Sequence, residues 1–218
     1  MRIGTWNLAG RHGDAHRSLI DQMRCDVLLL TEVSDRLDLS GWHVASTTEP
    51  MAPRRRWSAI ASREPIAEVN QPHPASVAGV IDGVRFCSSI LPWRGCTPRD
   101  FWVGEKLIDK QIHAASAIAA MRPQVWGGDW NQSFTGPETA GTIAGRRWLS
   151  EAIDRLHLQL PTADLPHRIE GISSIDHIAV PRAWSIVAAE RVVAELEGRR
   201  LSDHDVYVVA CQPSKSSP

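Results

Sequence analysis

Residues 125–131 combine an apolar run, two glycines and a polar end, in the order Val-Trp-Gly-Gly-Asp-Trp-Asn. A short apolar run that stops at glycine is typical of a buried strand. Such a strand would leave Asp129 and Asn131 at its exposed C-terminal end, on a short loop. From there the two side chains can reach the same point in space, one as an acceptor only and the other as a mixed donor and acceptor.

Four other segments repeat this design of an apolar run followed by a polar stop. They are residues 3–7 (IGTWN), 27–32 (VLLLTE), 174–177 (SIDH) and 201–204 (LSDH). Together the five segments can assemble one acidic pocket from distant parts of the chain.

The composition is ordinary for a globular protein. The 218 residues, 43% of them hydrophobic, can bury one core, so we expect a single domain over residues 1–211 and a disordered polar tail over 212–218. The formal net charge of −1 argues against tight, purely electrostatic binding to a polyanion, but it leaves room for a local basic face.

Cysteine spacing and hydropathy bear on the compartment. The cysteines are far apart and form no Cys-x-x-Cys pair, so we expect reduced thiols and neither a zinc site nor a disulfide framework. No apolar run approaches the ~18 residues that span a bilayer. The strand pattern begins at Arg2 and leaves no room for a signal peptide. We therefore expect a cytoplasmic protein without a membrane span, and nothing indicates an obligate protein partner.

Strands and helices follow from the periodicity of the apolar residues. Strands are predicted at 2–7, 27–31, 124–128, 175–180 and 205–211, and helices at about 14–24, 100–121 and 146–157. Asp82-Gly83 suits a tight hairpin turn within 80–86. Strands cluster between two helical stretches in each half, which predicts two packed sheets with helices outside, a layered α/β sandwich.

The residues themselves suggest a cation and an activated histidine. Glu32 at the end of a buried strand costs free energy unless it meets an arginine or a helix N-terminus, or binds a cation. Asp203 can join Glu32 on one hard cation such as Mg²⁺, which prefers oxygen ligands. Asp176 beside His204 would fix the tautomer of the imidazole and support its charged form. His177 should point to the opposite face of its strand and serve packing.

The five segments, in this order, resemble the endonuclease/exonuclease/phosphatase superfamily, which includes deoxyribonuclease I-like and exonuclease III-like phosphodiesterases. The matching pieces are Thr5-Trp6-Asn7, Leu30-Thr31-Glu32, Gly128-Asp129-Trp130-Asn131, Ser174-Ile175-Asp176 and Ser202-Asp203-His204. The resemblance implies a four-layer α/β sandwich with two packed, mainly antiparallel or mixed sheets, and a site at one mouth of the sheets.

The resemblance also implies roles for these residues. Glu32 would be the main ligand of Mg²⁺ or Mn²⁺, assisted by Asn7 and Asp203. Asp129 would orient or deprotonate the attacking water, and Asn131 would hold a phosphate oxygen. His204, backed by Asp176, would contact the phosphate and stabilise charge. Whether His204 or Asp129 takes the proton of the water is left open.

One position departs from the family pattern, which usually has a histidine or tyrosine where this chain has Ile90. If Ile90 lines the site, its replacement by histidine would raise activity. Arg94 is a candidate for the lost phosphate contact, since guanidinium matches phosphate oxygens, or it is a solvated loop residue. Trp93 would stack on a base or shield the site, whereas Trp130 is expected to pack inward.

The run Arg54-Arg55-Arg56-Trp57 is the strongest basic segment. Arg55 and Arg56 are candidate contacts to a phosphate backbone, with the tryptophan as a stacking platform; the alternative is a solvated loop. The remaining histidines show no ligand spacing and receive no role; they include His12, His16, His73, His113 and His167.

Three functions fit these features. The first is a Mg²⁺- or Mn²⁺-dependent nuclease that cleaves DNA or RNA. The second is the same chemistry on a small phosphorylated molecule or lipid headgroup. The third is a catalytically weak binding module of the same fold, which only the residue at position 90 supports. The salt dependence of activity would separate the first two, because nucleic-acid binding releases counterions.

Overall fold

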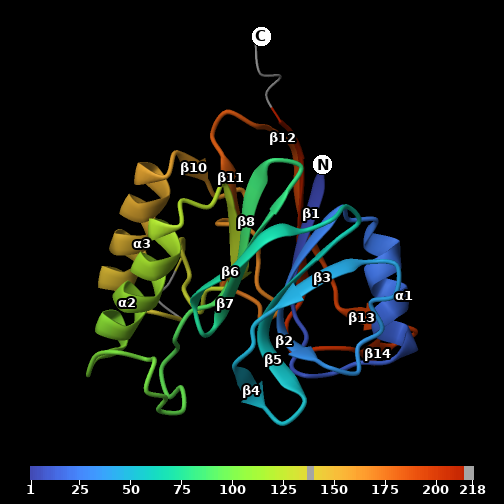
Figure 1. Cartoon of the computed structure of the whole chain (residues 1–218), viewed down its shortest axis with the longest axis horizontal. Coiled ribbons are helices and arrows are strands. Elements are labelled where there is room, and N and C mark those ends of the chain that lie inside the picture. Colours follow the sequence, from blue (N-terminus) through green and yellow to red (C-terminus); the bar gives the residue numbers. More distant parts are fainter. Residues whose placement is uncertain (137–139, 214–218) are drawn as a thin grey trace.

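Two β-sheets packed face to face form the centre of the protein, with helices on both outer faces (Figure 1). The structure is a computed structural model, and it describes residues 1–136 and 140–213. Helix α1 (Asp14–Met23) covers one sheet, and α2 (Leu107–Ala120) and α3 (Ile143–Arg155) cover the other. This arrangement confirms the predicted four-layer α/β sandwich.

The first sheet has seven strands, ordered β12-β15-β1-β2-β5-β3 with β4 paired to β5. Strands β1 and β2 are parallel and their neighbours are antiparallel. The strands are β1 (Arg2–Asn7), β2 (Val27–Ser34), β3 (His43–Ser46), β4 (Pro50–Ala52), β5 (Arg55–Ser62), β12 (Ser185–Val192) and β15 (Val206–Gln212).

The second sheet has six strands, ordered β10-β11-β9-β8-β7-β6, with β8 and β9 parallel. They are β6 (Ala67–His73), β7 (Ser76–Ile81), β8 (Val84–Ile90), β9 (Val125–Asp129), β10 (Leu158–Gln159) and β11 (Asp176–Pro181). A separate two-stranded ribbon, β13 (Glu195–Leu196) and β14 (Arg199–Arg200), lies near α1.

Three apolar clusters fill the spaces between the layers. One joins α1 to the first sheet, a second lies between the sheets, and a third joins the second sheet to α2 and α3. The tryptophans serve these cores: all but Trp93 and Trp148 are buried. The four cysteines are free and buried, in agreement with the expected thiols.

Most predicted elements are present, with shifted boundaries. The hairpin turn at Asp82-Gly83 is confirmed, because both residues have positive φ, 48° and 76°, as a type I′ turn requires. The helix expected from residue 100 begins only at Leu107, because Lys106 is its N-cap and the backbone N–H of Lys106 donates to Asp109. Gln212, expected to start the tail, is instead the last residue of β15 and pairs with Ser185 of β12; residues 214–218 of the predicted tail lie outside the described part of the chain. Among the described residues, no helix is long and apolar enough to cross a membrane.

Candidate active site

The strand pairing brings all five polar segments to one edge of the two sheets. Strand β1 ends at Asn7, which pairs with Thr31 of parallel β2, so Asn7 lies next to Glu32 near the end of β2. In the other sheet, Asp129 at the end of β9 pairs in register with Asp176 at the start of antiparallel β11. Strand β15 starts beside the end of β1, which places the turn containing His204 at the same edge.

Asn7 links the two sheets through its side-chain amide. Its Nδ2 donates to Glu32 Oε1 at 3.1 Å and to Asp129 Oδ2 at 2.9 Å. Its Oδ1 accepts the backbone N–H of Ala9 at 2.9 Å, which fixes the orientation of the amide. A side chain from β1 therefore holds carboxylates from β2 and β9 next to each other.

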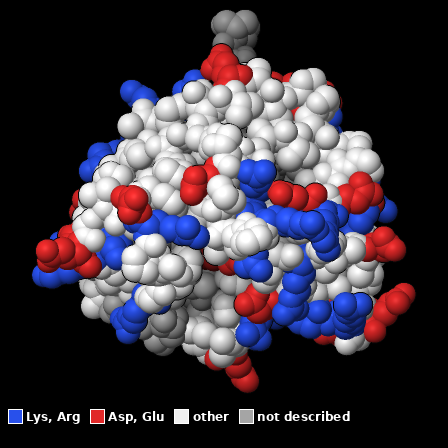
Figure 2. Space-filling model, turned by 60° about the horizontal axis from the view of Figure 1, so that its bottom comes forward, with Lys and Arg blue, Asp and Glu red and all other residues white. Residues whose placement is uncertain are grey.

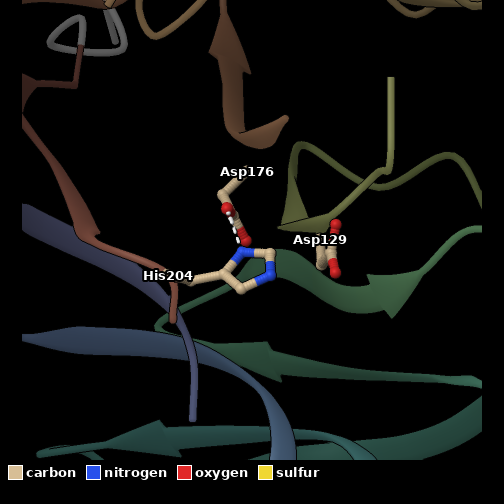
Figure 3. Close-up of side chains that lie close together, drawn as sticks. All are labelled: Asp129, Asp176 and His204. Carbon is tan, nitrogen blue, oxygen red and sulfur yellow. Dashed lines mark hydrogen bonds and ion pairs between the residues drawn. The ribbon is translucent and has the colours of Figure 1, made fainter. Parts of the chain in front are cut away.

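His204 and Asp176 form a close ion pair. His204 Nδ1 lies 2.7 Å from Asp176 Oδ2, and Figure 3 shows the other ring nitrogen on the side that faces Asp129. Serine hydroxyls support both partners. Ser202 Oγ accepts the His204 N–H at 3.2 Å and donates to Asn7 O at 2.6 Å, while Ser174 Oγ accepts the Asp176 N–H at 3.1 Å. These local bonds fix the two turns, so the pair is held in place before any substrate binds.

The pair changes the protonation of its members. Burial by itself lowers the pKa of His204, but the charge and hydrogen bond of Asp176, together with the charges of Asp129 and Asp203, outweigh burial and raise that pKa to about 10. Burial, followed by the negative charge of Asp176, raises the pKa of Asp129 to about 7. At neutral pH, His204 is therefore charged, and Asp129 is poised to accept or release a proton.

The donor atoms of this edge fit a hard divalent cation. One ligand atom each from Asp129, Asp176 and His204 lies within 4.8 Å of the others. The two carboxylates are the donors of this group, because the protonated His204 has no free nitrogen to offer. Asp176 Oδ1 is buried and has no hydrogen-bond partner among the described residues. Three carboxylates, with Glu32 held to Asp129 through Asn7, outnumber the cationic groups that face them. Oxygen donors with uncompensated negative charge suit Mg²⁺ or Mn²⁺.

The predicted ligands Glu32 and Asp203 are placed differently from each other. Glu32 belongs to the network but is ion-paired, with its Oε2 2.8 Å from Arg55 Nη1. This is the arginine contact that the sequence left as the alternative to a cation. Asp203 is exposed, and its Oδ1 lies 3.4 Å from Ser202 Oγ. Neither residue belongs to the group of three, and the ligand role of Asp203 remains a prediction.

The loop after β9 holds Asn131 beside Asp129. The Asn131 N–H donates to Asp129 Oδ1 at 3.0 Å, and its Nδ2 donates to Leu91 O at 3.0 Å. Trp130 between them is fully buried, which confirms the expected inward packing. His177 is also fully buried and contacts Gln132 O through Nε2 at 2.8 Å, so its packing role is confirmed.

Ile90 does not line the site. Its side chain is 1% exposed and belongs to the core between the second sheet and its helices. The expectation that histidine at position 90 would raise activity is therefore wrong in its premise, because an imidazole there would enter an apolar core. Trp57, proposed as a stacking platform, is likewise buried, at 3% exposure.

The remaining substrate candidates lie at the rim. Arg94 is exposed, and Trp93 is half-buried and packs against the same core. Arg56 is held by Asp35, with Nε 3.1 Å from Oδ1, and by the carbonyl of Thr48. Arg94, on its exposed loop, is therefore free to contact substrate. Arg56 first has to break its ion pair with Asp35.

Sequence reasoning missed His167. Its ring centroid lies 6.5 Å from that of His204, with the two planes nearly perpendicular. Its Nδ1 accepts the N–H of Ile169 at 3.1 Å, so the proton of the neutral ring is on Nε2. Nothing in the spacing of the histidines indicates this, because the position depends on the path of the loop before β11.

Comparisons with known proteins agree with this geometry. The model of the endonuclease/exonuclease/phosphatase family matches residues 4–204, and the chain belongs to that family. Among curated proteins, none matches.

Solved structures share the fold at low sequence identity. The 3′-5′ exonuclease NExo from Neisseria meningitidis is 18% identical, with a TM-score of 0.68 over 96% of this chain and 99% of that one. An AP endonuclease from Archaeoglobus fulgidus is 16% identical, with a TM-score of 0.69 over 96% and 98%. The endonuclease domain of the retrotransposon TRAS1 is 16% identical, with a TM-score of 0.62 over 95% and 96%. At these identities the likeness establishes the fold alone.

Proposed function

We propose that this protein is a divalent-metal-dependent phosphodiesterase, most simply a nuclease that hydrolyses DNA or RNA. The observation that carries the proposal is the charged His204–Asp176 pair, 2.7 Å apart, beside the buried carboxylate of Asp129. A phosphoryl group needs a cationic contact, an activated water and a fixed orientation, and this edge of the sheets offers groups for each.

The electrostatics support a division of roles. His204 is held protonated by Asp176, so it acts as a donor to a phosphate oxygen and does not accept a proton. Asp129, with a pKa of about 7, is the group suited to take the proton of the attacking water. Asn131, anchored at Leu91 and Asp129, sits where its amide can contact a phosphate oxygen. In this division Asp129 accepts the proton, whereas the sequence left the choice between His204 and Asp129 open.

A bound Mg²⁺ or Mn²⁺ would be held by Glu32 and Asn7, with Asp203 as the further predicted ligand, and would neutralise charge on the phosphate. For Glu32 to bind the ion, its contact with Arg55 has to loosen. For Asn7 to bind through its oxygen, its amide has to turn, because Nδ2 now faces Glu32 and Asp129 while Oδ1 accepts the N–H of Ala9. Arg55 would then be available to the phosphate, as would Arg94 and Trp93 at the rim.

The structural neighbours favour nucleic acid as the substrate. They include an exonuclease and an AP endonuclease, and one structure is a 3′ phosphatase bound to a product DNA hairpin. This phosphatase also keeps phosphate-monoester hydrolysis as the second candidate function. The edge brings Asn7, Glu32, Asp129, Asp176 and His204 together, which argues against a silent binding module. The cytoplasmic location stays a prediction.

The test is a substrate screen with matched variants. Purified protein is incubated with Mg²⁺ or Mn²⁺ and with plasmid, single-stranded DNA, RNA and bis-p-nitrophenyl phosphate. We expect hydrolysis that EDTA abolishes and that Glu32→Ala, His204→Ala and Asp129→Ala each reduce by several orders of magnitude. Glu64→Ala, which removes an exposed carboxylate elsewhere, is the control. Full activity of Glu32→Ala with an intact circular dichroism spectrum would refute the ligand assignment.

A further inference from the structure

Three neighbouring hollows of the surface follow one another beside the candidate active site, and each shares lining residues with the next. The first, about 410 Å³, is lined by the β1–α1 loop and by the ribbon of β13 and β14. It shares Gly10 and His12 with the second, about 230 Å³. The second shares Pro53 and Arg54 with the third, about 520 Å³, which reaches Arg99. We call this path the arginine groove.

The groove carries positive charge without local compensation. Arg55, Arg56 and Arg200 in its walls are each paired with an acidic side chain. Five further arginines are exposed, and none has an ion pair with an acidic side chain of the described residues. They are Arg11, Arg36, Arg54, Arg99 and Arg199.

This accumulation contrasts with the whole chain, which has a formal net charge of −1. Figure 2 shows Lys and Arg side chains gathered on the face that comes forward in that view, mainly in its right half. Asp35 is the one acidic residue lining any of the three hollows, and Arg56 neutralises it. A surface of this kind concentrates anions locally even when the protein as a whole is neutral.

The groove and the active site lie at the same edge of the first sheet. The middle hollow is lined by Ser34, two residues beyond Glu32, and by Arg55, which contacts Glu32 directly. The backbone N–H of Gly10, shared by two hollows, donates to the carbonyl of Glu32 at 2.8 Å. An anion in the groove is therefore close to the carboxylate that we propose as a metal ligand.

We infer that the arginine groove binds the backbone of a nucleic-acid strand and holds several phosphates on the first-sheet side of the active site. This inference rests on the proposed function, since the strand would lead to the catalytic edge. A single phosphate is smaller than any one of these hollows and can contact only one or two of the arginines. Five arginines without an acidic partner, spread over three neighbouring hollows, match a chain of regularly spaced phosphates, each neutralised by a guanidinium.

The test is strand binding by variants that remove equal charge at two places. The groove variant is Arg54→Ala/Arg99→Ala/Arg199→Ala. The control variant is Arg24→Ala/Arg122→Ala/Arg147→Ala, whose arginines are exposed, unpaired among the described residues and outside the three hollows. Fluorescence anisotropy is measured in EDTA with labelled strands of about 4 and about 16 nucleotides, with intact strand verified on a gel.

We expect the groove variant to bind the longer strand at least about tenfold more weakly than wild type at about 100 mM salt. Its slope of log affinity against log salt should fall by about 2, at roughly 0.7 for each lost contact on a single strand. The control variant should stay within about twofold of wild type, and a groove variant with lysine in place of alanine should regain the slope.

Two results overturn the inference. One is an equal loss of affinity in the groove and control variants, which would mean that net charge alone governs binding. The other is a wild-type protein that binds the longer strand no more tightly than the shorter one. Hydrolysis of bis-p-nitrophenyl phosphate by wild-type protein tests the proposed function separately, so either idea can fail while the other stands.

Discussion

Replacing Asp129 by asparagine removes a buried negative charge and nearly preserves the shape of the side chain. In the folded protein the pKa of Asp129 rises from 3.8 to about 7, chiefly because the carboxyl group is buried and secondly because Asp176 is nearby. The folded state thus binds more protons than the unfolded state between these pH values. Stability must fall as pH rises through that window and level off above about pH 7.

The size of the effect follows from the two pKa values. At about 1.4 kcal/mol per pH unit, ionised Asp129 destabilises the folded protein by about 4 kcal/mol above pH 7. Asparagine avoids this cost but has one acceptor oxygen for the two donors that now bind Asp129, Asn7 Nδ2 at 2.9 Å and the Asn131 N–H at 3.0 Å. The loss of one of these hydrogen bonds costs roughly 1–3 kcal/mol at any pH. The pH-dependent part is therefore the cleaner quantity, and it amounts to about 2 kcal/mol between about pH 5.5 and pH 7.

The assay is urea unfolding of wild type and Asp129→Asn in EDTA, followed by tryptophan fluorescence, at about pH 5.5 and about pH 8.5. We expect the variant to gain about 2 kcal/mol relative to wild type between the two conditions. Asp164→Asn, at an exposed position, should follow wild type at both. If the unfolding free energies of the three proteins change with pH in parallel, the pKa of Asp129 is not raised by burial, and its assignment as proton acceptor loses its support.

Two further perturbations test the neighbouring contacts. Asp176→Asn removes the carboxylate that keeps the pKa of His204 near 10, so the alkaline limb of the rate profile should move to lower pH; an unmoved limb would show that charged His204 is not required. Gly10→Ala should lower stability by about 1–3 kcal/mol and weaken hydrolysis, because its φ is 70° and its Cβ would lie 2.3 Å from Arg55 Nε. Gly171→Ala is the control, because Gly171 has a similar φ of 80° and a Cβ there would meet nothing within 4 Å. If both variants lower the midpoint of thermal unfolding equally, backbone strain alone explains the effect at Gly10.

The sequence predicted the elements that carry the site because their signals are local. An apolar run that stops at Asn7 or Asp129 indicates a strand end without any knowledge of the neighbours, and the run before Glu32 indicates a strand although β2 continues to Ser34. The alternation along β11 also separated Asp176 from His177 correctly, since successive side chains in a strand point to opposite faces. The ordered set of such ends was enough to indicate the family.

Only the tertiary structure decided which of these ends touch and which candidates lie apart. Asn7 meets Asp129 across the gap between two sheets, and Asp203 points into solvent while its neighbour His204 reaches Asp176. Ile90 is buried although its strand ends at the site. Local periodicity fixes the face of an element on which a side chain lies, whereas contacts between elements depend on register, sheet packing and loop paths that join residues far apart in the chain.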